Sequence, residues 1–227
     1  MAFALAKAIF YLCSPTVEMV SSQHVDREST KDAMLRIAME TIDESGEAVI
    51  RLDAILEAVG VSPSSLYHHY GNLSGLIEAA HIERFRRYVL SNAIELKAGI
   101  EAASSAKDFR NLVDSLMAVY FDNSRSLARM QRSHAFGSAY GRAEFLHKIG
   151  LAQKEALDIG ASAIDLAKEK GFVRADLDSR AFIALFDSQS FGRVLVEATG
   201  EAQLGADWNA LALSTVHFLL FGEGLSK

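Results

Sequence analysis

The sequence contains little cysteine and little proline. Of its 227 residues, one is cysteine and two are proline. The single Cys13 excludes a disulfide within the chain and any Cys-x-x-Cys metal site, so a reducing, cytoplasmic location is expected. Because proline interrupts helices, its scarcity favours long ones. No apolar run reaches the roughly 20 residues that a membrane-spanning helix needs, and we expect no membrane association.

Positive charge is also scarce. The formal net charge is −6. Half of the residues are hydrophobic, which is enough to bury a core in one large or two small domains. Residues 29–80 carry eight acidic and three basic side chains, a net charge of −5. Domains that bind nucleic acid normally carry the opposite sign, because neutralisation of phosphates supplies most of their non-specific affinity. A basic cluster, Arg84, Arg86 and Arg87, follows directly.

Apolar residues recur with helical spacing along most of the chain, without a β-hairpin signal or an internal repeat. The spacing and the capping residues predict an all-α fold. The expected helices cover residues 33–44, about 74–99, a segment opening at Ser105, residues 126–170 with interruptions near Gly137 and Gly141, and two closing segments, about 179–199 and about 208–221.

The most informative segment runs from Val59 to Tyr70. Gly60 can adopt the positive φ that ends a helix, Ser62 can cap the next helix, and Pro63 suits its first position. Leu66 and Tyr70 are four residues apart and can share a buried face. The outward-facing residues are then Ser64, Ser65, Tyr67, His68 and His69. An ordinary helical hairpin is one interpretation, and the other is a helix-turn-helix whose hydroxyls and imidazoles contact phosphates and base edges.

The surrounding residues favour the second interpretation. Val59-Gly60-Val61-Ser62, Leu66-Tyr67-His68-His69-Tyr70 and Leu76 resemble the N-terminal domain of the TetR family of transcriptional regulators over about fifty residues. Two positions depart from the family pattern. Arg51 stands where a Ser or Thr usually opens the second helix, and Leu73 stands where a phosphate-contacting Lys usually lies. The predicted DNA-binding residues are Arg51, Ser62, Ser64, Ser65, Tyr67, His68 and His69.

The resemblance implies a division into three parts. Residues 1–28 are an N-terminal arm, residues 29–73 a three-helix helix-turn-helix domain, and residues 74–227 a helical ligand-binding and dimerisation domain. The apolar beginning of the arm lacks the positive leading region of a signal peptide. A flexible arm, an over-extended start with Met19 as the true first residue, and a segment packed on a neighbouring subunit remain open.

The resemblance also implies a pocket for a small molecule among the middle helices. Suitable lining residues are Tyr88, Met117, Tyr120, Phe121, His134, Phe136 and Tyr140, with Arg132, His147 and Gln153 as further polar anchors. Each of these residues could equally belong to an ordinary core. The lining points to an apolar or aromatic effector of unknown identity, and no other cofactor is expected. No metal site is expected either, because adjacent histidines such as His68 and His69 point about 100° apart on a helix.

The two closing helices suggest a homodimer, since each carries an apolar stripe and a helix-turn-helix protein normally reads DNA as a two-fold pair. Packing of both stripes within one subunit is the alternative. The predicted interface consists of Phe182, Phe186, Gln189, Arg193, Leu211, Thr215 and Phe218.

These observations predict a ligand-responsive regulator, a repressor that binds operator DNA as a homodimer. The alternative is a helical small-molecule-binding or interaction protein with weak or lost DNA binding, which Leu73 and the acidic domain would allow. An enzyme is not expected, because the sequence has no nucleophile elbow, phosphate loop or metal motif. The operator, the effector and the direction of its effect are left open.

Overall fold

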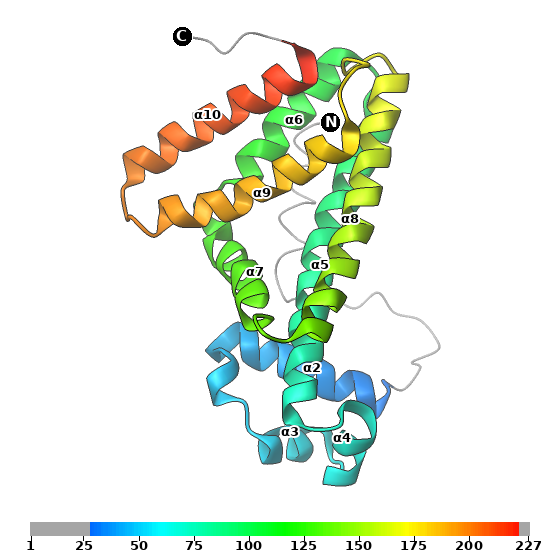
Figure 1. The fold of residues 1–227 in the computed structure, drawn as a ribbon, viewed down its shortest axis with the longest axis vertical. Coiled ribbons are helices and arrows are strands. Elements are labelled where there is room, and N and C mark those ends of the chain that lie inside the picture. Colours follow the sequence, from blue (N-terminus) through cyan, green and yellow to red (C-terminus); the bar gives the residue numbers. More distant parts are fainter. Residues whose placement is uncertain (1–27, 223–227) are drawn as a thin grey trace, which may run out of the picture.

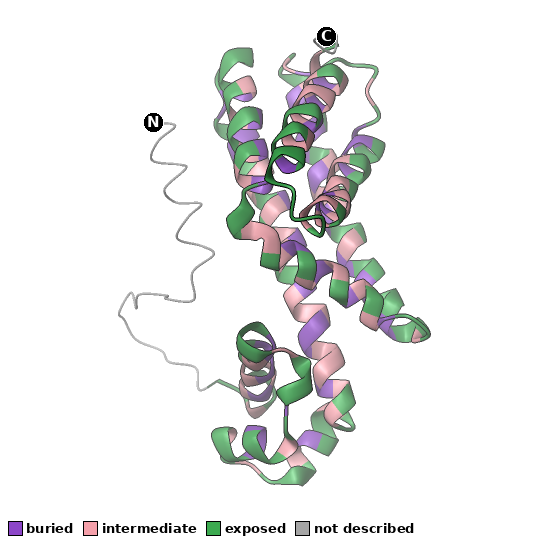
Figure 2. Cartoon of the chain, turned by 90° about the vertical axis from the view of Figure 1, so that its left-hand side faces the viewer, coloured by how far each residue is buried: buried purple, intermediate pink, exposed green. Residues whose placement is uncertain are grey.

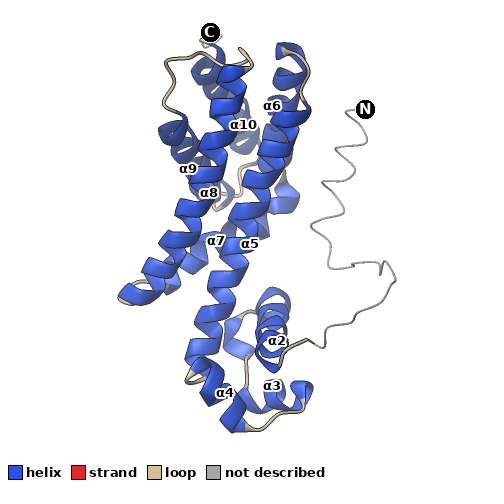
Figure 3. Ribbon diagram, turned by 90° about the vertical axis from the view of Figure 1, so that its right-hand side faces the viewer, coloured by secondary structure: helices blue, strands red, loops and turns tan. Residues whose placement is uncertain are grey.

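The computed structural model describes residues 28–222, which form nine α-helices, two short 3-10 helices and no strand (Figures 1 and 3). The predicted all-α fold is confirmed. The predicted arm lies outside the described residues, apart from its last residue. In chain order the helices are α2 (Thr30–Ser45), η1 (Glu47–Val49), α3 (Leu52–Val59), α4 (Pro63–Tyr70), α5 (Leu73–Ala102), α6 (Ala106–Tyr120), η2 (Asn123–Arg125), α7 (Ser126–Ser138), α8 (Ala143–Glu169), α9 (Ser179–Glu197) and α10 (Ala202–Phe221).

Helices α2, α3 and α4 pack together at the lower end of Figure 1. Ser29 precedes α2 and caps it, because its Oγ accepts a hydrogen bond of 3.1 Å from the backbone N of Asp32. The apolar stripes of the three helices meet the beginning of α5 in a buried core, as the burial colours of Figure 2 show. This core contains Met34, Ala38, Met39, Ile42, Ile50, Ile55, Leu56, Leu66, Leu76 and Ala80.

Helix α5 belongs to both parts of the molecule. It begins at Leu73 after Asn72, whose side chain accepts a hydrogen bond from the backbone N of Gly75. Its first turns contribute Leu76 and Ala80 to the core of the small domain. The packing of the small domain therefore extends beyond residue 73, where the sequence suggested a boundary.

Helices α5 and α8 lie side by side and run in the same direction (Figure 1). The rings of His81 and Phe145 lie 6.4 Å apart near one end, while Lys170 Nζ donates to the carbonyl of Ile100 near the other. Helices α6, α9 and α10 pack around the far end of this pair, and α7 lies between them and the small domain. No helix among residues 28–222 is long and apolar enough to cross a membrane.

The break between α7 and α8 lies where the sequence predicted it, and one helix limit differs. Helix α7 ends at Ser138, one residue after Gly137, and Gly141 has a φ of +73° in the turn before α8. Helix α10 begins at Ala202 rather than near Trp208. Gly205 lies inside this first part of α10 and faces Arg193, since a Cβ there would lie 2.9 Å from Arg193 Nη2.

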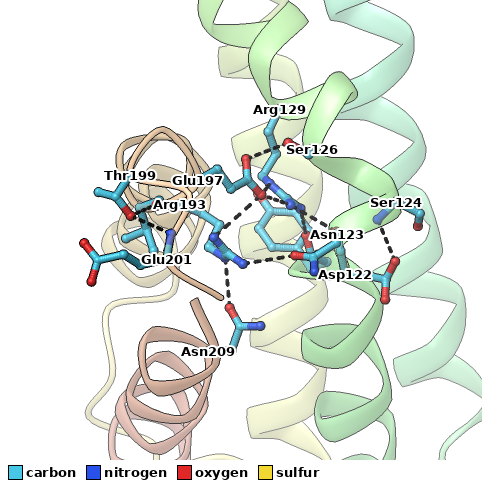
Figure 4. A network of polar contacts seen from close by, with 12 residues as sticks. Asp122, Asn123, Ser124, Ser126, Arg129, Arg193, Glu197, Thr199, Glu201 and Asn209 are labelled. Atoms are coloured by element: carbon cyan, nitrogen blue, oxygen red, sulfur yellow. Dashed lines mark hydrogen bonds and ion pairs between the residues drawn. The ribbon is translucent and has the colours of Figure 1, made fainter. Parts of the chain in front are cut away.

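A buried polar network joins α7 to α9 (Figure 4). Arg129 is 1% exposed, and its guanidinium donates to the carboxylate of Glu197 and to two backbone carbonyls, those of Tyr120 and Asp122. Glu197 also accepts a hydrogen bond of 3.0 Å from Ser126 Oγ. Arg193 lies 3.8 Å from the same carboxylate. One carboxylate therefore balances two buried guanidinium groups.

Candidate functional site

The turn between α3 and α4 has the backbone geometry that the sequence predicted. Gly60 is left-handed, with φ +74° and ψ +38°, and the carbonyl of Leu56 accepts hydrogen bonds from the N–H groups of Gly60 and Val61. Pro63 is the first residue of α4. Ser62 occupies the capping position, but its side chain does not cap the helix. Its Oγ lies 2.7 Å from the Oγ of Ser64, which leaves the first amide groups of α4 without a side-chain acceptor from Ser62.

Helix α4 presents a polar face to solvent. Leu66 is fully buried, whereas the Tyr67 side chain is 56% exposed. Tyr70 anchors the helix, because its Oη donates a 2.7 Å hydrogen bond to the carbonyl of Lys31, and burial raises its pKa to about 12. Of the residues expected on this face, Ser62, Ser64, Tyr67, His68 and His69 are exposed and Ser65 is half-buried.

Arg51 and Leu73, the two residues that depart from the family pattern, make different contacts in the structure. Arg51 is exposed, and its Nη1 donates to the carbonyls of Ala48 and Ile50 in its own loop. In this conformation it closes the loop before α3 rather than capping the helix. Leu73 is half-buried and packs against the core of the small domain. It therefore contributes to packing and offers no charge to a phosphate.

Three of the eight acidic side chains in residues 29–80 form ion pairs with arginines. Arg36 pairs with Glu40, Arg84 with Asp43, and Arg142 with Glu78. Helix α4 contains no Asp or Glu. The negative net charge therefore originates from other elements, and the exposed face of α4 carries hydroxyl and imidazole groups.

A cavity of about 90 Å³ lies between α5, α6, α8 and α9. Drug-sized ligands occupy pockets of roughly 300–1,000 Å³. An effector of that size would require side chains to move. The apolar lining residues are Val89, Ala93, Leu96, Leu116, Val119, Ala156, Leu157, Ile183 and Phe186, together with Gly160.

Polar side chains enter this cavity from several helices. Tyr120 Oη donates a 3.1 Å hydrogen bond to Asp187 Oδ1, and Gln153 Nε2 donates one of 2.6 Å to Asp187 Oδ2. Burial, together with the Asp187 carboxylate, raises the pKa of Tyr120 and keeps its hydroxyl protonated. Burial also raises the pKa of Glu95, against the opposing effect of Arg125. The cavity thus offers both donors and acceptors within an apolar wall.

The residues expected to line a pocket are only partly brought together. Tyr120 lines the cavity, and so does Gln153. Tyr140 is 92% exposed in the turn before α8, and His134 and His147 are exposed, so none of these three lies at the cavity. The other expected residues pack in the cores without lining it: Met117, Phe121, Tyr88 and Phe136.

Sequence patterning also missed polar cavity residues. Glu95 lies on α5 and Asp187 on α9, and for both helices the sequence pattern indicated mainly the apolar positions. Arg132, expected as a polar anchor for a ligand, is 3% exposed. It forms an ion pair with Asp187, which lines the cavity, but does not line the cavity itself. In the sequence, such residues can be recognised as charged side chains between apolar helical positions. This pattern does not distinguish a residue that binds a ligand from one that forms an internal ion pair.

The expected interface residues on α9 and α10 divide into two groups. Phe182 and Arg193 are 6% and 4% exposed and pack within the same chain, while Phe186 stacks on Tyr120 at 4.9 Å. Gln189 and Thr215 are half-buried. Leu211 and Phe218 are exposed, at 63% and 41%. The outer surface of the two helices also carries apolar residues that were not in the expected set: Leu185, Leu195 and Leu204.

One group of side chains among the described residues is arranged so that it could hold a metal ion, contrary to the sequence expectation. Glu47, His81 and His134 each offer a ligand atom, and these atoms lie within 4.8 Å of one another. The cluster lies away from the cavity, where η1, α5 and α7 meet.

Comparisons with known proteins identify the fold. No family model matches the sequence, and no curated protein matches it significantly. Among solved structures, Salmonella enterica GusR is 19% identical with a TM-score of 0.58, covering 86% of this chain and 98% of its own. A TetR-family transcriptional regulator from Cytophaga hutchinsonii is 17% identical with a TM-score of 0.58, covering 89% and 100%. A TetR transcription regulator from Haloarcula marismortui is 13% identical with a TM-score of 0.57, covering 84% and 98%.

These structures match nearly their whole length to most of this chain. At this level of identity the likeness concerns the fold. The chain therefore has the all-helical fold of the TetR family of transcriptional regulators.

Proposed function

We propose that this protein is a ligand-responsive transcriptional regulator that represses its target by binding operator DNA as a homodimer. The observation that carries the proposal is the exposed polar face of α4, held by the buried Leu66 and by the hydrogen bond from Tyr70 to Lys31. A short helix anchored from behind, with hydroxyl and imidazole groups in front, suits insertion into a major groove.

Replacing Tyr67 by alanine is expected to weaken operator binding about 10- to 100-fold, since one specific contact contributes about 1–3 kcal/mol. The Tyr67 side chain is 56% exposed, so the fold should be unaffected. The measurement is fluorescence polarisation with DNA from the region upstream of its own gene. Tyr140→Ala is the matched control, because Tyr140 is 92% exposed and lies outside α4. Equal operator affinity for both variants would refute the proposed docking face.

The same titration at several salt concentrations tests the alternative, a helical binding protein that has lost strong DNA affinity. The acidic small domain and the packed Leu73 favour that alternative. A regulator should bind one site far more tightly than unrelated DNA, with affinity that falls as salt rises. Weak binding with no sequence preference would support the alternative.

The exposed apolar residues of α9 and α10 support the homodimer. Leu204, Leu211 and Phe218 recur every seven residues along α10, and all three are at least 40% exposed. On a helix this spacing forms one stripe suited to a second helix. Leu185 and Leu195 extend the apolar surface on α9, which packs beside α10. An isologous contact between two copies would bury this surface.

Replacing Leu211 by glutamate is expected to weaken the dimer at least about tenfold, because it places two desolvated charges in a two-fold interface. The measurement is sedimentation equilibrium over a range of protein concentrations. Leu151→Glu is the control, since Leu151 is 53% exposed on α8, away from the proposed interface. If the Leu211 variant stays as dimeric as the control, the interface lies elsewhere.

The cavity between α5, α6, α8 and α9 is the proposed effector site. Its apolar wall suits an apolar or aromatic molecule, and Tyr120, Gln153 and Asp187 supply polar contacts. Because α5 also enters the small domain, an effector that shifts α5 would act on the position of α4. Such regulation requires unequal affinity for the DNA-binding and non-binding forms.

A further inference from the structure

Three potential metal ligands meet at the junction between the small domain and the rest of the chain. Glu47 belongs to η1, His81 to α5 and His134 to α7. His81 Nε2 lies 2.6 Å from Glu47 Oε2, and the rings of His81 and His134 are 5.3 Å apart. The three ligand atoms lie within 4.8 Å of one another. Residues from distant parts of the sequence thus converge on one point.

His81 is unusual within this group because it is almost completely buried. The residue is 1% exposed, and its Nδ1 is buried without a hydrogen-bond partner. Burial of a polar atom without a partner is unfavourable.

We propose that Glu47, His81 and His134 bind one divalent transition-metal ion of the Zn²⁺ type. Two imidazole nitrogens and one carboxylate oxygen form a donor set typical of Zn²⁺, with a further position left for water. Ligand atoms around tetrahedral Zn²⁺ lie roughly 3.3–3.5 Å apart, given bond lengths near 2.0–2.1 Å. The contact of 2.6 Å between His81 Nε2 and Glu47 Oε2 would therefore have to widen by roughly 0.8 Å, and a separation as long as 4.8 Å would have to shorten by roughly 1.4 Å. The solvent-accessible side chains of Glu47 and His134 permit these movements.

The surroundings of the cluster are compatible with a cation. Arg84 places a positive charge close to His81, but it is paired with Asp43. Gln131 Nε2 donates to the same Asp43 carboxylate at 3.2 Å. Glu47 supplies one negative charge directly to the ion, while His134 Nε2 lies 3.4 Å from Ser138 Oγ, a contact that can orient its ring.

Metal binding would add α7 to a pair of elements, η1 and α5, that the contact between Glu47 and His81 already joins. A bound ion would hold η1 of the small domain to α7 of the larger domain, with α5 between them. We expect this to fix the orientation of the small domain. The consequence for DNA rests on the function proposed above, whereas the binding of the ion does not.

The test is a calorimetric titration of the tag-free full chain with Zn²⁺ alone, repeated with Co²⁺, whose visible absorption reports its coordination. We expect one ion per chain and a rise in melting temperature of about 5–10 °C at a hundredfold excess over the dissociation constant. His134→Ala should weaken binding at least about tenfold and, at the same Zn²⁺ concentration, reduce the rise to about half or less. His147→Ala is the matched control, because His147 is also exposed but lies outside the cluster.

A second variant guards against effects on folding. Glu47→Gln keeps the shape of the side chain, which is 43% exposed, and should also weaken binding while the metal-free protein remains folded. Absence of Zn²⁺ binding would overturn the proposal. So would binding that survives both His134→Ala and Glu47→Gln, since the ion would then be held elsewhere in the chain.

Discussion

Replacing Glu197 by alanine is expected to lower the free energy of unfolding by about 3–5 kcal/mol. The Arg129 side chain is 0% exposed and that of Glu197 12% exposed, so the substitution leaves a buried guanidinium without its carboxylate. Arg193, 3.8 Å from the same carboxylate, loses the negative charge that it shares with Arg129 (Figure 4). Urea unfolding at fixed protein concentration, followed by circular dichroism, measures the loss.

Glu155→Ala provides a matched control for this prediction. Glu155 pairs with Arg86 at the surface, where both side chains are about half exposed. Removing an exposed pair should cost about 1 kcal/mol or less. A double variant, Arg129→Met with Glu197→Leu, should recover part of the stability, because it removes two of the three buried charges and leaves Arg193 without the carboxylate. Equal losses for Glu197→Ala and Glu155→Ala would show that the Arg129 network contributes little.

Gly75→Ala is expected to destabilise the protein by about 3 kcal/mol, at the upper end of the cost of overpacking. A Cβ at Gly75 would lie 2.0 Å from the backbone oxygen of Tyr70, the last residue of α4. Backbone atoms cannot turn aside as a flexible side chain can, so the turn between α4 and α5 must open. The gain of about 1 kcal/mol from replacing glycine by alanine in a helix is too small to compensate. The melting temperature in thermal unfolding and the affinity for operator DNA should both fall.

Gly150→Ala is the matched control, because this helical glycine of α8 is exposed and a methyl group added to it would have no neighbouring atom within 4 Å. There the helical preference of alanine acts alone, and stability should rise by about 0.5–1 kcal/mol. A Gly75→Ala protein as stable as this control would show that the turn tolerates a wider geometry.

The helix-turn-helix could be predicted because its signals are local. Gly60 and Pro63 fix the backbone of the turn through their own conformational preferences, and the spacing of Leu66 and Tyr70 fixes which face is buried. These properties depend on neighbours in sequence. Two details differed: the Ser62 hydroxyl bonds to Ser64 instead of capping the helix, and Ser65 is half-buried.

The cavity and the charged interior could not be predicted in the same way, because they depend on how helices meet. Tyr140 has the chemistry of a pocket residue but lies 92% exposed in a turn. Arg193 has the chemistry of a surface residue but is buried against Gly205 and hydrogen-bonded to Asn209. His134 reaches His81 only through the packing of α7 on α5, which helical periodicity within one segment does not reveal.

The continuity of α5 also limits how this protein can be divided. Along its 30 residues α5 supplies Leu76 to the core of the small domain, Phe85 to a core shared with α7 and α8, and Ile100 to a core shared with α6, α8, α9 and α10. A fragment ending at residue 73 would expose the face of the small domain that Leu76 and Ala80 cover. Exchange of the small domain between relatives would have to preserve the rotational register of this helix, about 100° per residue. A single residue inserted in α5 would rotate the following side chains by about 100° and turn them away from the core in which they pack, although none of the original residues would be replaced.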